Sequence, residues 1–342
     1  MSASAGIGPM VQASALSVVF RGRGRGPHAH AVDGVDFAVG RGEVVAIVGE
    51  SGSGKTTLAR ALLGLERPTD GAVAAFGQAI PVDAGGLRSY RRRVQMVLQD
   101  PTGALNPRQT VYESVAEGLR IHRIVAERRD SGQSVGEVEL VAQALSRAGL
   151  RPPEQLFLRY PHELSGGQRQ RVVIAGALAL DPELLVADEP VSSLDASIRG
   201  EILALLLRLR DELGLAIVVV THDLGLAWNI ADRIAVMYLG RIVEAGTVEE
   251  VLQSPKHPYT RALLSVVPEM AELTPVVLHG EIPDPTRIPA GCRFHPRCPA
   301  LADDVAAAAG IAADCRGTAL PILPATGAHH AACHLHPQPP AG

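Results

Sequence analysis

Short apolar runs alternate with segments of helical periodicity along this chain. Residues 44–48, 184–187 and 216–220 are continuous apolar runs of strand length. Runs of this kind are typical of strands buried in a parallel sheet. Residues 57–65 and 198–212 have apolar positions at helical spacing. The alternation predicts an α/β fold with a parallel sheet and helices on both of its faces.

The segments around this core differ in pattern. Residues 14–48 predict short strands joined by turns, and the glycine- and arginine-rich residues 21–27 predict a hairpin tip. Residues 100–180 are mainly helical in pattern, with a polar loop expected at 128–136. No internal repeat with a period of 20–50 residues is present, which indicates one core of this type and not two.

The composition changes near residue 253, beyond which come many prolines, seven of the twelve histidines and all four cysteines. We therefore expect a first domain at 1–250, with a helical subdomain at about 100–175, and a C-terminal extension at 251–342. The end of the extension is rich in proline and histidine, and we expect it to be a disordered, solvated tail that holds no metal. Its histidines are His329, His330, His334 and His336.

Composition and charge exclude several classes of protein. The chain is 46% hydrophobic and 20% charged, as ordinary globular proteins are. Its formal net charge of −4 disfavours a strongly basic nucleic-acid binder. No apolar run approaches the roughly 18 residues of a membrane span, and residues 1–17 lack the pattern of a signal peptide. We expect a soluble cytosolic chain that would reach a membrane through a partner.

The strongest chemical signal directly follows the apolar run at 44–48, where the sequence fits G-x-x-x-x-G-K-[ST]. Glycines there let the backbone wrap a phosphate, and successive N–H groups face the anion. Lys55, one of only two lysines, would reach the β- and γ-phosphates of a nucleotide, and Thr56 would bind Mg²⁺. The loop and its continuation are Gly49, Glu50, Ser51, Gly52, Ser53, Gly54, Lys55, Thr56 and Thr57.

An acidic pair follows the apolar run at 184–187. Asp188, at the expected strand end, would hold Mg²⁺ through water, and Glu189 would orient or deprotonate the attacking water. Acidic strand ends are common in α/β proteins, so the assignment depends on the phosphate loop upstream.

Four further motifs make residues 12–250 resemble the ATP-binding cassette (ABC) ATPases. Residues 164–170, Leu-Ser-Gly-Gly-Gln-Arg-Gln, are similar to the family signature, and Gln99 matches the Q-loop. Ser192, Ser193, Leu194 and Asp195 match the D-loop, and His222 matches the switch histidine. The resemblance implies a P-loop NTPase core with an antiparallel β subdomain, a helical subdomain and a small C-terminal extension.

The same resemblance implies roles for these residues. Gln99 would sense Mg²⁺ and the γ-phosphate of ATP, and His222 would contact that phosphate and position the water. Two cassettes would close head-to-tail around two ATP molecules, with the signature of one capping the phosphate bound on the other. The residues implied in that second contact are Ser165, Gly166, Gly167, Gln168 and Asp195.

The adenine base in this family usually stacks on an aromatic residue upstream of the phosphate loop. Phe20 is the first choice, His28 and His30 compete with it, and a place for Phe20 in the core is the alternative.

Finer resemblance points to the oligopeptide and dipeptide importers, and within them to the second of two ATPase subunits. Residues 100–107, 160–163 and 257–264 carry the resemblance to these importers, and Glu163, Gln168 and residues 188–199 are similar to the second subunit. It implies a sister or identical ATPase, two membrane permease subunits, an extracytoplasmic substrate-binding protein as an indirect partner, no nucleic acid, and a peripheral place on the cytoplasmic face of the membrane. Nickel, glutathione and opine importers share these features. A soluble ABC ATPase uncoupled from transport is the more distant alternative.

The four cysteines are Cys292, Cys298, Cys315 and Cys333. Their spacing lacks the C-x₂-C pairs of zinc ribbons and bacterial ferredoxins. Residues 292–299 resemble the cysteine-containing tail of the peptide-importer ATPases, which implies a [4Fe–4S] cluster on the four thiolates. Zinc bound by cysteines with His295 or His334, and free thiols in a loose tail, remain alternatives.

Overall fold

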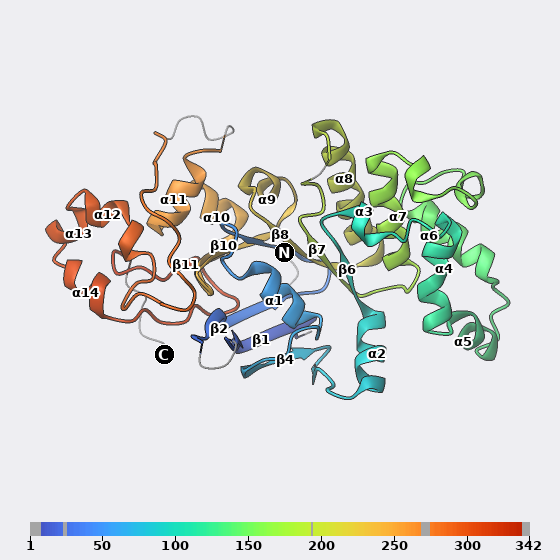
Figure 1. The fold of residues 1–342 in the computed structure, drawn as a ribbon, viewed down its shortest axis with the longest axis horizontal. Helices are drawn as coiled ribbons and strands as arrows, with labels where there is room; N and C mark the ends of the chain where they lie inside the picture. The colour runs from blue at the N-terminus through green and yellow to red at the C-terminus, as the bar shows by residue number, and fades with distance from the viewer. Residues whose placement is uncertain (1–7, 23–25, 193, 268–273, 337–342) are drawn as a thin grey trace, which may run out of the picture. The chain divides into compact units, whose positions relative to one another are not determined.

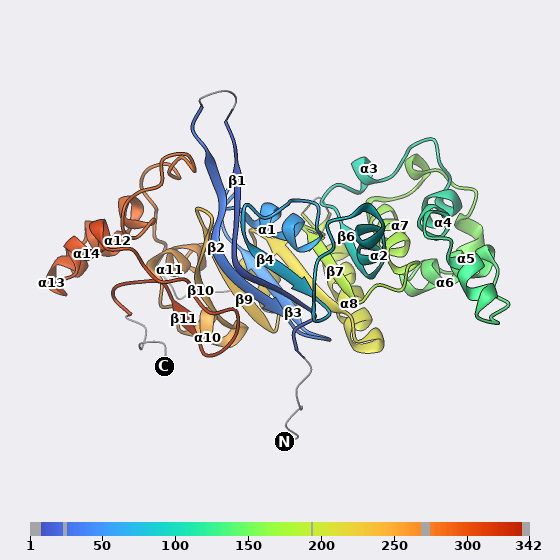
Figure 2. The same ribbon diagram turned by 90° about the horizontal axis from the view of Figure 1, so that it is seen from below.

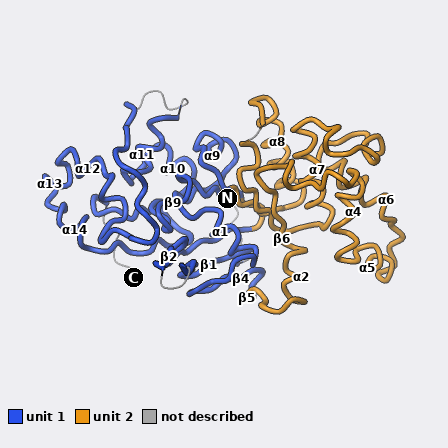
Figure 3. Tube along the Cα trace, in the orientation of Figure 1, with its two compact units in different colours: residues 1–40, 44–79, 220–342 blue, residues 41–43, 80–219 orange. Residues whose placement is uncertain are grey.

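The computed structural model describes residues 8–22, 26–192, 194–267 and 274–336. The chain divides into two compact units (Figure 3). The first comprises residues 1–40, 44–79 and 220–342, and the second comprises 41–43 and 80–219. The boundary that we expected near residue 250 lies inside the first unit, so a separate C-terminal extension stays a prediction.

The first unit contains an antiparallel sheet with the strand order β2-β1-β4-β5. Figure 2 shows β1 (Val11–Phe20) and β2 (Ala29–Val39) running side by side as a long hairpin. β4 (Asp70–Ala75) pairs with β1, and β5 (Gln78–Ala79) pairs with β4. The two hairpin strands are longer than the short strands that we predicted, and register shifts interrupt their pairing without ending either strand.

The same unit holds part of a second sheet, in the order β11-β10-β9-β3. β3 (Val44–Val48) is buried throughout and pairs in parallel with β9 (Arg233–Tyr238). β10 (Arg241–Thr247) and β11 (His330–Ala331) continue it as antiparallel strands. α1 (Lys55–Leu62) follows β3 after a glycine-rich loop, residues 49–54, which is of ordinary length for a strand–helix connection.

Among the described residues downstream of 220, the first unit also contains six short α-helices. Figure 1 shows α12, α13 and α14 grouped together near the C-terminal end. The helices are α9 (Leu224–Ile230), α10 (Val248–Gln253), α11 (Pro258–Leu264), α12 (Pro299–Ala302), α13 (Val305–Ala308) and α14 (Ala312–Gly317).

The second unit combines parallel strands with most of the longer helices. It holds β6, β7 and the first four residues of β8, in the order β8-β7-β6, and β6 pairs in parallel with β7. These elements confirm the predicted α/β class. The strands are β6 (Val94–Val97), β7 (Leu184–Asp188) and β8 (Ala216–Thr221), and the helices are α2 (Ala84–Arg93), α3 (Pro101–Ala104), α4 (Val111–Ile121), α5 (Ile124–Asp130), α6 (Glu137–Arg147), α7 (Gly166–Leu178) and α8 (Ala196–Leu213).

Two details of these helices bear on the predictions. α5 extends to Asp130, so the loop expected at 128–136 begins later than predicted, after a helical turn that the polar sequence concealed. α4 and α7 each begin with a capping box, in which the residue before the helix and the third residue of the helix satisfy each other's backbone N–H groups. Within the described part of the chain, no helix is long and apolar enough to cross a bilayer.

Candidate nucleotide site and cysteine cavity

The loop between β3 and α1 has a conformation that only glycine allows at two points. Gly49 has φ +152°, and a Cβ atom there would lie 2.2 Å from the carbonyl oxygen of Met237. Gly54 has φ +107°, and its Cβ would lie 2.1 Å from the carbonyl oxygen of Ala31. The sheet backbone therefore packs directly against the loop, which leaves its opposite side, Ser51 and Gly52, exposed.

Lys55 is held against this loop. Its side chain is buried, and Nζ donates hydrogen bonds of 2.8 Å to the carbonyl oxygens of Gly49 and Glu50. Ser53 is also buried, and its Oγ has no hydrogen-bond partner within the described residues. α1 begins at Lys55 without a side-chain cap on its N–H groups. A cation, a spare hydroxyl and an uncapped helix N-terminus fit a phosphate anion.

Glu50 has partners that the sequence did not suggest. Its N–H donates a 2.8 Å hydrogen bond to the hydroxyl of Tyr259. Both of its carboxylate oxygens accept from the guanidinium of Arg297, at 2.7 and 3.1 Å. Neither partner lies near Glu50 in sequence, so no local pattern could have revealed them.

The acidic pair and the Q-loop glutamine lie in the second unit. Asp188 is the last residue of β7 and is buried. Gln99 Nε2 donates a 3.0 Å hydrogen bond to Glu189 Oε2. Glu189 has φ +46°, a left-handed conformation that is uncommon outside glycine and that marks a constrained position. The structure thus brings together Gln99 and Glu189, two of the predicted site residues.

The signature residues form the start of α7. The Ser165 side chain accepts from the N–H of Gln168, and the Gln168 side chain accepts in return from the N–H of Ser165. Gly167 packs closely, because a Cβ there would lie 2.7 Å from Cγ2 of Ile198. Asp195 precedes α8 and makes no side-chain cap to it. Ser193 of the predicted D-loop lies outside the described residues.

The remaining predicted groups lie in the first unit. His222 follows β8 directly and is exposed. Phe20 is the last residue of β1 and is 44% exposed, so its alternative place in the core is wrong. The end of a strand on this hairpin leaves the ring in solvent. His28 is exposed and His30 is half-buried, and the choice among the three for adenine stacking stays a prediction.

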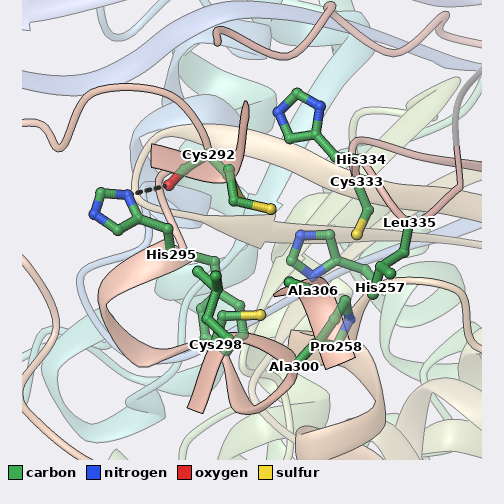
Figure 4. Close-up of a pocket in the computed structure, with 13 residues that line it drawn as sticks. His257, Pro258, Cys292, His295, Cys298, Ala300, Ala306, Cys333, His334 and Leu335 are labelled. Carbon is green, nitrogen blue, oxygen red and sulfur yellow. Dashed lines mark hydrogen bonds between the residues drawn. The ribbon is translucent and has the colours of Figure 1, made fainter. Parts of the chain in front are cut away.

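All four cysteines line one cavity, which is shown in Figure 4. They carry free thiols, and three of them are buried, with Cys298 half-buried. Burial raises the pKa of Cys292 to about 12 and that of Cys333 to about 11. His257, His295 and His334 also line the cavity, and His295 Nδ1 lies 2.9 Å from the carbonyl oxygen of Cys292.

Four thiols from three separate segments suit a thiophilic metal group. Among the described residues, however, no three His, Cys, Asp or Glu side chains form a group that could hold a single metal ion. The loose-tail alternative does not describe Cys333, which is buried.

The histidine-rich tail differs from our expectation. His329 is buried, and its Nε2 lies 2.6 Å from Oε1 of the fully buried Glu244. Lys256 Nζ donates to the carbonyl oxygen of His329, and β11 pairs with β10. The prediction of a disordered, solvated end is therefore wrong for residues 329–336, because a buried carboxylate on β10 requires a partner and His329 provides it. Residues 337–342 lie outside the described part.

A glycine-rich loop with a buried lysine, an acidic strand end and a capped Ser-Gly-Gly helix start define an ATPase of the P-loop class. Two family models match the chain: "ABC transporter" at residues 32–192, and "Oligopeptide/dipeptide transporter, C-terminal region" at residues 243–303. The chain belongs to the ATP-binding subunits of ABC transporters, and it is an ATPase of that family.

Individual relatives agree. The chain is 42% identical to the "Probable peptide ABC transporter ATP-binding protein y4tS" of Sinorhizobium fredii, over 90% of this chain and 83% of that protein. It is 45% identical to the "Oligopeptide transport ATP-binding protein OppF" of Salmonella typhimurium, over 79% of this chain and 80% of the relative.

Solved structures share the fold. One is cbiO1 from Clostridium perfringens, part of the ABC transporter complex cbiONQ, with a TM-score of 0.61 and 31% identity over 72% of this chain and 91% of that one. Another is the dimeric ATP-binding cassette MJ0796 in a post-hydrolysis state with ADP and Pi, with a TM-score of 0.60 and 32% identity over 70% of this chain and 99% of that one.

Proposed function

We propose that this chain hydrolyses ATP to power the import of oligopeptides or dipeptides through a membrane ABC transporter. The observation that carries the proposal is one continuous likeness across both the cassette and the C-terminal region, to relatives that are named for peptide transport. Nickel, glutathione or opine import is the alternative within the same group. A soluble ABC ATPase uncoupled from transport would have no use for the C-terminal region matched at 243–303.

Each residue has a proposed part in hydrolysis. The loop N–H groups and Lys55 hold the phosphates, and Phe20 stacks on the adenine. Glu189, oriented by Gln99, directs the water to the γ-phosphate, and His222 contacts that phosphate. Thr56, Gln99 and Asp188 would hold Mg²⁺, which when bound neutralises phosphate charge. Their oxygen donors fit that ion, since hydroxyl, amide and carboxylate oxygens are the groups that Mg²⁺ takes.

The signature supports a proposed dimer. Ser165 and Gly166 are exposed at the start of a thirteen-residue helix, where N–H groups favour an anion. We expect them, with Gly167, Gln168 and Asp195, to cap ATP bound on a sister or identical subunit. Two permeases would hold the pair on the cytoplasmic face of the membrane as peripheral subunits, and an extracytoplasmic binding protein would choose the solute.

We further propose that Cys292, Cys298, Cys315 and Cys333 hold a [4Fe–4S] cluster, with zinc as the alternative. Their convergence on one cavity supports this. A four-iron cluster is wider than one ion, so its thiolates stand further apart than the ligands of a single metal. The buried thiols must lose their protons on binding, which couples metal uptake to the folding of this region.

Transport is tested by uptake of a radiolabelled tripeptide in cells that lack the subunit. The wild-type chain should restore uptake and Glu189→Gln should not. Parallel assays with radioactive nickel and with glutathione separate the alternatives. Restored nickel or glutathione uptake without peptide uptake would move the assignment to that solute. No restored uptake, combined with ATP hydrolysis by the purified chain, would favour the uncoupled ATPase.

The metal is tested by purification without oxygen, visible absorption, and iron, sulfide and zinc analysis. We expect a broad band near 400 nm and about four iron atoms per chain, as a four-cysteine cluster requires. A colourless protein with one zinc would replace the cluster, and a metal-free protein would leave thiols alone.

A further inference from the structure

One seven-residue segment, Cys-Arg-Phe-His-Pro-Arg-Cys at 292–298, contributes both to the cysteine cavity and to the phosphate loop. Its two cysteines line the cysteine cavity. Its second arginine, Arg297, instead makes the two-pronged ion pair with Glu50 of the phosphate loop. The Arg297 side chain is only 6% exposed and that of Glu50 is 26% exposed, so the guanidinium is shielded from water while the carboxylate is partly accessible. A bidentate arginine–carboxylate pair fixes orientation as well as distance.

A second residue of the same region holds Glu50 from another side. The Tyr259 hydroxyl accepts the Glu50 N–H, and Tyr259 is fully buried. Burial raises the pKa of this hydroxyl, so it stays protonated. Its ring packs with Tyr238 and Phe294 at centroid distances of 4.8 and 5.3 Å. Phe294 belongs to the same segment as Arg297, so this aromatic packing supports both residues that hold Glu50, Arg297 and Tyr259.

The third polar group of Glu50, its carbonyl oxygen, accepts from Lys55 Nζ. The backbone N–H, the carboxylate and the carbonyl of one loop residue are therefore all engaged, two of them by residues from beyond position 250. The carbonyl that holds the phosphate-binding lysine is thus positioned by the C-terminal region. If the loop already has its binding conformation before ATP binds, less binding free energy is lost in ordering the loop.

We propose that Arg297 and Tyr259 are positioning residues for ATP, which hold Glu50 so that the phosphate loop is preformed. The inference rests on the ATP binding of the proposed function. Without Arg297 and Tyr259, the phosphate loop occupies its binding conformation for a smaller fraction of the time. The apparent dissociation constant rises by the inverse of that fraction, while the groups that act on the water are unchanged.

The test is titration of the full-length chain with a fluorescent ATP analogue and Mg²⁺. Arg297→Ala should raise the dissociation constant about tenfold, as a drop of the competent fraction to a tenth requires. Arg297→Lys should fall between it and the wild type, because an ammonium cannot make the two-pronged pair. Tyr259→Phe should weaken binding less than Arg297→Ala does. Arg287→Ala, an exposed arginine of the same region, is the matched control and should bind as the wild type does.

Steady-state hydrolysis separates positioning from general damage. Arg297→Ala should raise KM for ATP about tenfold and change kcat less than about twofold. A fall in kcat with unchanged KM, or an unchanged dissociation constant, overturns the proposal.

A double-mutant cycle isolates the interaction between Glu50 and Arg297 even if a single variant folds less well. Glu50→Gln and Arg297→Ala together should weaken ATP binding no more than the worse single change, because both remove one pair. Fully additive losses would mean that Arg297 acts by another route and would overturn the proposal. A wild-type chain that fails to bind ATP would overturn the proposed function itself, and the positioning role with it.

Discussion

Gln99 and Glu189 are 90 residues apart in sequence, yet the amide of one donates a 3.0 Å hydrogen bond to the carboxylate of the other. The bond limits how the carboxylate can turn, and the left-handed backbone of Glu189 points to a position under constraint. Such a fixed acceptor suits a group that must orient one water molecule against a phosphate.

Glu189→Gln should abolish most hydrolysis and keep ATP binding. The amide has nearly the shape of the carboxylate but cannot accept a proton, so the rate should fall by at least about 10²–10³, as for other precisely aimed groups. Phosphate release and nucleotide binding are measured on the same preparation. Glu212→Gln, an exposed glutamate at the end of α8, is the control and should hydrolyse ATP normally. An unaltered rate for Glu189→Gln in the assembled transporter would remove Glu189 from this role.

Gly54→Ala should disrupt the phosphate loop. The new methyl group would meet the Ala31 carbonyl at 2.1 Å, and φ +107° disfavours any side chain. We expect ATP affinity to fall at least about tenfold, because the loop backbone must move to relieve the clash. The matched change is Gly200→Ala in α8, where the added Cβ meets nothing within 4 Å. It should stabilise the fold by about 0.5–1 kcal/mol. Equal ATP affinity in the two variants would show that the close packing at Gly54 does not affect ATP binding.

Glu244→Ala should destabilise the first unit. The carboxylate is fully buried, accepts from the N–H groups of Lys256 and His257, and pairs with His329. Removing it leaves these partners unpaired, and the free energy of unfolding should fall by about 3–5 kcal/mol. Chemical denaturation measures this change. Glu249→Ala on α10 is exposed and should change stability by less than about 0.5 kcal/mol. A similar small effect for Glu244→Ala would mean that solvent reaches this group.

Cysteine and histidine variants distinguish the two metal hypotheses. If four thiolates bind a [4Fe–4S] cluster, Cys315→Ser should lower the iron content, while His295→Ala and His334→Ala keep it. If zinc is bound with a histidine, one of these two histidine variants should lose the zinc. Metal analysis after anaerobic purification measures both, and iron retained at the wild-type level in Cys315→Ser would contradict a four-cysteine site.

Much of the geometry of the candidate nucleotide site was predictable, because it depends on residues close in sequence. Lys55 and Thr56 follow a glycine-rich stretch after an apolar strand, and the Ser165–Gln168 capping box lies within four residues. Such local patterns specify backbone conformation by sterics and short hydrogen bonds. The length of β1 and the end of α5 were less accessible, since both depend on pairing and packing that the local sequence does not display.

Sequence alone therefore determined the α/β class, the phosphate loop, the acidic strand end and the cysteine count. Only the tertiary structure decided that His329 is buried against Glu244 and not solvated. It also decided that the four thiols share a cavity, and that Arg297 and Tyr259 hold Glu50. The physical reason is that a buried charge or polar group must find a partner in space, and the chain can supply that partner from any distance along its length.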